Sequence, residues 1–119
     1  MADPAIIDPQ AIENLRALNP EDGDAFLREI AGIFLEDTPL RLKELDDSLA
    51  AADNGKFTRA AHSIKGSSSN LGANGVRAVA EKLEHQSREN GLANVATLVA
   101  ELKAEYTRAS AELNKLIAQ

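Results

Sequence analysis

Residues 94–117 read NVATLVAELKAEYTRASAELNKLI, and the spacing of their apolar and small side chains decides the fold. These side chains recur at alternating steps of four and three residues, at Val95, Val99, Leu102, Tyr106, Ala109, Leu113 and Leu116. A heptad with two such positions places one narrow apolar stripe along a helix. The segment is therefore predicted to be a long helix that buries this stripe against other helices of a bundle.

The segments before it carry helix start and stop signals. Asp8-Pro9 is an N-cap followed by proline at the first helical position, which predicts a short helix over about residues 9–18. Acidic residues after Asn19-Pro20 predict a second helix to about residue 37. Asn54-Gly55 is interpreted as a turn before a helix over about residues 56–71, which Gly72 ends in the left-handed conformation. A further helix runs from Asn74-Gly75 to Asn90-Gly91.

Pro39 leaves two alternatives open for the region between residues 37 and 52. Leu42, Leu45 and Leu49 resume helical spacing beyond the proline. Either one long helix kinks at Pro39, or Thr38 caps a new helix that has Pro39 at its first position.

The connections are short, so sequential helices are expected to be antiparallel neighbours. The predicted architecture is all-α: an up-and-down antiparallel four-helix bundle with a short extra N-terminal helix. Residues 1–119 are expected to form a single domain, which is the ordinary size for a chain of this length. The hydrophobic content of 44% with only 3% aromatic residues also favours closely packed helices.

Composition excludes several classes of function. The chain has no cysteine, which excludes disulfides and thiolate metal sites. The net charge of −6 argues against a nucleic-acid-binding protein. No apolar run approaches the roughly 18 residues of a membrane span, and Met1-Ala2-Asp3-Pro4 does not begin a signal peptide. We expect a cytoplasmic protein with no nucleic-acid or membrane partner.

The stretch most informative about chemistry is AHSIKGSSSNLGA, residues 61–73. At about 100° per residue, one face of its helix is apolar or small, with Phe57, Ala61, Ile64, Ser68 and Leu71. His62 lies roughly 140° from the centre of that face and Gly66 roughly 180° from it, with Lys65 at the boundary. His62 is therefore predicted to face solvent beside Lys65 and Gly66.

These three residues together indicate an exposed nucleophile that has a charge partner and an open approach. An exposed neutral imidazole offers a nucleophilic ring nitrogen. Lys65, one turn along, places an ammonium near an anion carried by that ring. Gly66 costs about 1 kcal/mol relative to alanine within a helix, and it removes the side chain that would cover the imidazole.

The sequence HSIKGSS at residues 62–68, followed by NLGA at 70–73, resembles the signature of the histidine-containing phosphotransfer (HPt) family. Residues 34–42 and Leu83-Glu84 resemble its neighbouring helices, and Ile64 stands where leucine is common. The resemblance covers roughly residues 12–116.

The resemblance implies that His62 accepts a phosphoryl group, that Lys65 stabilises it, and that Gly66 gives a partner access. Ser69 would hydrogen-bond the imidazole or the phosphate. The implied partners are receiver domains of response regulators or hybrid histidine kinases, which supply a phosphorylatable aspartate and the Mg²⁺. The chain itself is expected to bind no cofactor and no metal, and to act as a monomeric carrier without autokinase activity rather than as an enzyme.

Two other functional hypotheses remain open at this point. The bundle is alternatively a non-catalytic helical adaptor in which His62 is incidental, or a bundle that self-associates through its heptad helix. His85 is interpreted as a solvated surface residue. Arg59, one turn before His62, either adds positive potential near the phosphate or is simply a solubilising residue. The chain is equally consistent with a free-standing protein and with one domain of a larger kinase.

Overall fold

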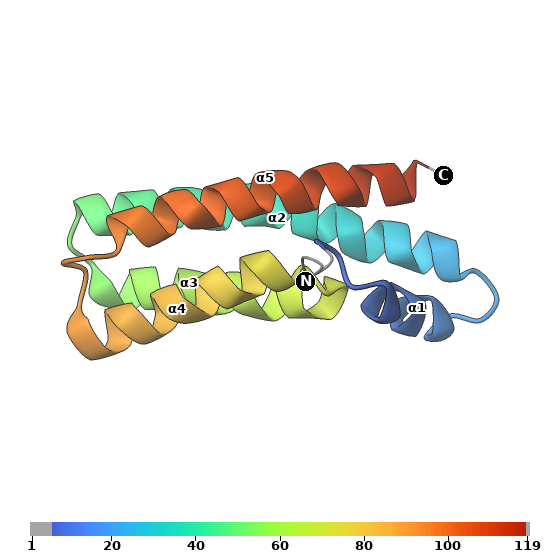
Figure 1. Cartoon of the computed structure of the whole chain (residues 1–119), viewed down its shortest axis with the longest axis horizontal. Coiled ribbons are helices and arrows are strands. Elements are labelled where there is room, and N and C mark those ends of the chain that lie inside the picture. Colours follow the sequence, from blue (N-terminus) through green and yellow to red (C-terminus); the bar gives the residue numbers. More distant parts are fainter. Residues whose placement is uncertain (1–5, 119) are drawn as a thin grey trace, which may run out of the picture.

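The computed structural model describes residues 6–118, which form five helices and contain no strand. The helices are α1 (Pro9–Ala17), α2 (Gly23–Ala50), α3 (Asn54–Leu71), α4 (Asn74–Asn90) and α5 (Ala96–Ile117). Figure 1 shows α2 beside α5 and α3 beside α4, with the four helices running alternately up and down. The predicted all-α, up-and-down bundle with a short N-terminal helix is confirmed. The predictions for residues 1–5 and 119 lie outside the described residues.

The core consists of the apolar stripes predicted from the sequence. On α3 the five side chains predicted to face inward are buried, and on α5 the heptad positions Val99, Leu102, Ala109 and Leu113 are buried as well. Helix α3 packs between α2 and α4, and α5 closes the bundle against α4 and α2. None of the helices among residues 6–118 combines the length and the apolar character needed to cross a membrane.

A single helix, α2, runs through Pro39, so the first of the two alternatives holds. Proline has no N–H, and the carbonyl of Leu35, four residues earlier, therefore lacks its usual helical donor. The hydroxyl of Tyr106 on α5 donates to that carbonyl at 3.1 Å, and its ring contacts Phe34 with centroids 5.6 Å apart. A side chain of a neighbouring helix thus replaces the backbone hydrogen bond that Pro39 removes.

The turn between α2 and α3 lies two or three residues earlier than predicted. Asn54 and Gly55 are the first residues of α3, while Ala51 and Ala52 make the turn. The Asp53 carboxylate accepts a hydrogen bond from the backbone N–H of Lys56 at 3.1 Å, and this N-cap lets the helix begin at Asn54.

Helix α1 fills the space that unequal helix lengths create. At 1.5 Å per residue, α2 with 28 residues spans about 42 Å and α3 with 18 residues about 27 Å. Figure 1 shows α1 beneath the first half of α2, beyond the end of α3. Gly72, at φ 66°, ends α3 as predicted, and its carbonyl accepts from the N–H of Asp8 at 2.9 Å. A Cβ on Gly72 would lie 2.7 Å from the Cβ atoms of Asp8 and Ala11, so glycine is needed where α1 meets α3.

Candidate functional site

His62 lies in the middle of α3 and points away from the core. Its side chain is 66% exposed, whereas its neighbours Ala61 and Ile64 are fully buried. The buried residues flank His62 because α3 turns about 100° per residue, which leaves the imidazole on the outer side of the bundle. The outward position predicted for His62 is therefore confirmed.

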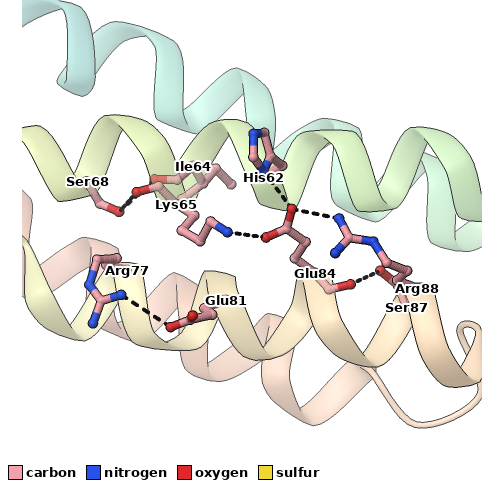
Figure 2. Close-up of polar contacts among 9 residues, drawn as sticks. All are labelled: His62, Ile64, Lys65, Ser68, Arg77, Glu81, Glu84, Ser87 and Arg88. Carbon is pink, nitrogen blue, oxygen red and sulfur yellow. Dashed lines mark hydrogen bonds and ion pairs between the residues drawn. The ribbon is translucent and has the colours of Figure 1, made fainter.

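The δ nitrogen of this exposed imidazole contacts a buried carboxylate. Glu84 of α4 has a side chain only 5% exposed, and its Oε2 lies 2.6 Å from Nδ1 of His62. Its other oxygen, Oε1, accepts from Nζ of Lys65 at 2.5 Å, and Arg88 donates to Oε2 at 3.0 Å. Figure 2 shows Glu84 reaching from α4 toward α3, where His62 and Lys65 meet it, while Arg88 approaches along α4.

These contacts keep Glu84 ionised. Burial raises the pKa of a carboxyl group because it penalises the charged form. Hydrogen bonds from Lys65 and His62, together with the charges of those groups, outweigh burial here and bring the pKa of Glu84 below its usual 4.5. A carboxylate in this state can only accept hydrogen bonds.

The contact consequently selects one tautomer of His62. Because Glu84 can only accept, Nδ1 must carry the proton in the 2.6 Å contact. In the neutral imidazole the lone pair is then on Nε2, the ring nitrogen that Glu84 does not contact. The site offers a nucleophilic nitrogen of defined identity on an exposed helical face.

The other predicted site residues differ in how close they lie to the imidazole. Lys65 contacts the same carboxylate as His62, that of Glu84, and its side chain is 30% exposed. Gly66 is exposed, and a Cβ at that position would meet no atom within 4 Å. Ser69 is exposed but lies seven residues from His62, which is about 10 Å along the helix axis. The structure brings Glu84, and not Ser69, to the imidazole; a role for Ser69 toward a phosphate stays a prediction.

A hollow adjoins the imidazole on the side toward the start of α3. Six residues line it: Thr58, Arg59, His62, Ser63, Glu84 and Arg88. Of the two roles considered for Arg59, this position favours a contribution to the positive potential beside His62. The hydroxyl of Thr58, which lines this hollow, forms a hydrogen bond with the hydroxyl of Ser87 on α4, with the two oxygens 2.6 Å apart.

Among residues 6–118, no three His, Cys, Asp or Glu side chains are grouped closely enough to hold a metal ion. His85 is exposed on α4, as predicted for a surface residue.

Glu84 and Arg88 were missed as site residues, although a signal for Glu84 was present. Glu84 follows Val76 by eight residues and Ala80 by four, so it lies on the buried stripe of α4. A carboxylate in an apolar stripe needs partners from a neighbouring helix. That reasoning could have identified Glu84, but it could not have named His62 and Lys65 as its partners.

Comparisons with known proteins bear on the family and the fold. The family model described as Hpt domain matches residues 29–112. Among solved structures, histidine-containing phosphotransfer protein B (HptB) from Pseudomonas aeruginosa PAO1 is similar in fold, with a TM-score of 0.86 over 98% of this chain and 97% of that chain, at 22% sequence identity. No curated protein sequence matches the chain significantly.

Proposed function

Because the chain belongs to the Hpt domain family, whose role is histidine phosphotransfer in two-component phosphorelays, we propose that His62 is the residue that carries the phosphoryl group. The observation that carries the proposal is the contact between Nδ1 of His62 and the ionised Glu84, which leaves Nε2 as the exposed nucleophile.

In the forward step, the Nε2 lone pair attacks the phosphorus of an aspartyl phosphate on the partner. The N–P bond forms as the P–O bond to the aspartyl carboxylate breaks, and that carboxylate keeps the bonding electrons. The imidazole becomes cationic, with the proton still on Nδ1, and Glu84 lies 2.6 Å away to stabilise the charge. In the reverse step the leaving group is then a neutral imidazole rather than an imidazolate anion. The same contact between Nδ1 and Glu84 therefore serves transfer in both directions.

Charge near the phosphoryl group is supplied by cations already on the site. Lys65 and Arg88 both contact Glu84 and are partly or largely exposed, with side chains 30% and 59% accessible. Either can turn from the carboxylate toward a phosphoryl group on the neighbouring ring, because long side chains reorient without moving the helix. Such positive charge stabilises the phosphoryl oxygens during transfer.

The partners we propose are receiver domains, which contribute the aspartate and the Mg²⁺. The docking surface would consist of the outer face of α3 and the adjoining face of α2. Ile33 and Leu40 of α2 are 55% and 62% exposed, and Arg41 of α2 lines a hollow together with Ser63 of α3. Large apolar side chains left exposed on a helix favour protein docking.

The proposal is tested by incubating the protein with phosphorylated receiver domains from its source genome. We expect phosphate on the chain that is labile in acid and stable in alkali, and we expect it to be lost in His62→Gln but kept in the matched control His85→Gln. Phosphate on His62→Gln, or no phosphate from any receiver in the set, contradicts the proposal and returns preference to the adaptor hypothesis.

A second arm tests whether the chain is only a carrier. Incubation with ATP and Mg²⁺ alone should leave the chain unphosphorylated, and phosphorylation in this arm would overturn that part of the proposal. The monomeric state and the cytoplasmic location stay predictions.

A further inference from the structure

We propose that the first half of α3, with Lys56 and Arg59, is a cationic docking surface for an acidic face of the protein that exchanges the phosphoryl group. The inference rests on the proposed function, because it assigns a recognition element to the same partner. It concerns Lys56, which does not line the hollow beside His62, and Arg59, whose positive charge beside His62 would then also act on the partner.

The first observation is an uneven distribution of charge along the chain. The protein has 19 acidic and 13 basic residues, yet residues 54–80 contain no Asp or Glu. That segment includes all of α3 and the start of α4, and it carries Lys56, Arg59, Lys65 and Arg77. All charged side chains of the helix that bears His62 are therefore basic, in a protein whose net charge is −6.

The second observation is that two of these cations lack an ionic partner. Within residues 6–118, neither Lys56 nor Arg59 lies within 4.0 Å of a carboxylate oxygen, although both are exposed. Nearby carboxylates are already engaged. Asp53 accepts from the backbone of α3, and Glu44 accepts from Arg41 at 2.5 Å.

The third observation is that these cations line two adjoining hollows. One hollow is lined by Arg41, Glu44, Lys56, Arg59, Ala60 and Ser63. The other is the hollow beside His62, and Arg59 and Ser63 line both. Arg59 thus stands between the imidazole and a second concave region in which Arg41 and Lys56 outnumber the single carboxylate of Glu44.

This arrangement fits carboxylate side chains on a protein surface. Unpaired cations at the rim of an interface act mainly on the rate of association, because they attract an oppositely charged partner before contact. The net charge of −6 would repel an acidic partner that approaches any other face of the protein. A local basic surface therefore also orients the encounter, so that the partner meets the face that carries His62. A nucleic acid is disfavoured because the cations occupy one short helix of an acidic protein.

The test compares two double variants that remove equal charge. Lys56→Gln with Arg59→Gln alters the proposed surface. Arg28→Gln with Lys82→Gln is the matched control, because these two cations also lack an ionic partner among residues 6–118. Arg28 lines a hollow with Leu116 and Ile117 of α5, and Lys82 lies on α4 about 200° around the helix from Glu84.

The first readout is the second-order rate constant of phosphoryl transfer between the phosphorylated receiver and the chain. At 0.01 M ionic strength, where charges act over about 30 Å, we expect the surface variant to be about fivefold slower than wild type and the control to be within about twofold. At 1 M, where the range is about 3 Å, all three proteins should react at nearly the same rate. Equal slowing of the two variants at low ionic strength would overturn the proposal.

The second readout does not depend on transfer and uses a peptide of ten glutamates as the acidic probe. In an NMR titration of the whole chain, amide shifts should concentrate in the first half of α3 and weaken in the surface variant. Shifts spread evenly over all exposed cations, or centred on Arg28 and Lys82, overturn the docking surface even if no receiver transfers phosphate. Conversely, phosphate on His62→Gln refutes the proposed function and leaves the peptide result to decide this inference.

Discussion

Replacing Gly66 with alanine should make the protein more stable and a poorer phosphoryl carrier. A Cβ at this position meets no atom within 4 Å, and the residue does not have a positive φ, so alanine introduces neither a clash nor strain. Alanine is preferred over glycine inside a helix by about 1 kcal/mol, which for a domain of this size raises Tm by roughly 3–6 °C.

The effect on transfer should have the opposite sign. Gly66 is exposed and one turn from His62 on the same outward face, and the proposed function requires a partner's active site to approach the helix there. Displacement of reacting groups by about 1 Å can cost up to roughly a hundredfold in rate, so we expect transfer from a receiver to fall about ten- to a hundredfold. Phosphoramidate, a small donor that needs no protein contact, should phosphorylate Gly66→Ala and wild type at similar rates.

Gly32→Ala is the matched control. A Cβ on Gly32 in α2 also meets nothing within 4 Å, so this variant should gain similar stability and keep wild-type transfer. The prediction is checked by measuring Tm and the transfer rates from both donors on wild type, Gly66→Ala and Gly32→Ala. The reasoning fails if Gly66→Ala is destabilised, if it transfers from the receiver as fast as wild type, or if phosphoramidate is slowed as much as the receiver.

Three further predictions concern stability. Because the pKa of Glu84 in the folded protein is below the usual 4.5, the ionised carboxylate stabilises the fold fully above about pH 4.5, and this stabilisation is lost as pH falls through the folded pKa. The difference in free energy of unfolding between wild type and Glu84→Gln, measured by urea unfolding, should therefore decrease from pH 6 to pH 3. A difference that stays constant over this range would refute the prediction. Tyr106→Phe removes the donor to the Leu35 carbonyl and should lower the free energy of unfolding by about 1–2 kcal/mol. The loss should be smaller in a Pro39→Ala background, because residue 39 then has a backbone N–H that can donate to the same carbonyl. Equal losses in both backgrounds would show that the hydroxyl does not replace the missing helical hydrogen bond. Gly72→Ala should cost about 2–3 kcal/mol in chemical unfolding because of its φ of 66° and the 2.7 Å approaches to α1, and a neutral effect would contradict the described packing.

Periodicity along single helices was enough to predict the bundle and the orientation of His62. The stripe through Phe57, Ala61 and Ile64 defines the inner side of α3 wherever that helix packs, so the outer side follows directly. The partners across helices were not predictable in this way. Which residue of α4 lies opposite His62 depends on how far the two helices slide along each other, and that register is set by packing on both.

The proline in α2 illustrates the same limit. Whether the helix continues depends on a donor for the Leu35 carbonyl, and that donor, Tyr106, is 71 residues away along the chain. The sequence showed Tyr106 on the buried stripe of the last helix, but nothing local to Pro39 indicated the contact. The start of α3 was placed two residues too late for a simpler reason: Asn54-Gly55 was interpreted as a turn, although the Asp53 carboxylate caps a helix that begins at Asn54.

The exposed position of His62 on one face of α3 constrains the kinetics of any relay built on this chain. A single exposed nitrogen on one helical face cannot be approached by a donor and a recipient at once, so their occupancies are mutually exclusive. Exchange must then follow a double-displacement scheme in which the first partner leaves before the second arrives. Throughput would be governed by dissociation as much as by chemistry, and an excess of either partner would inhibit the other by occupying their common face.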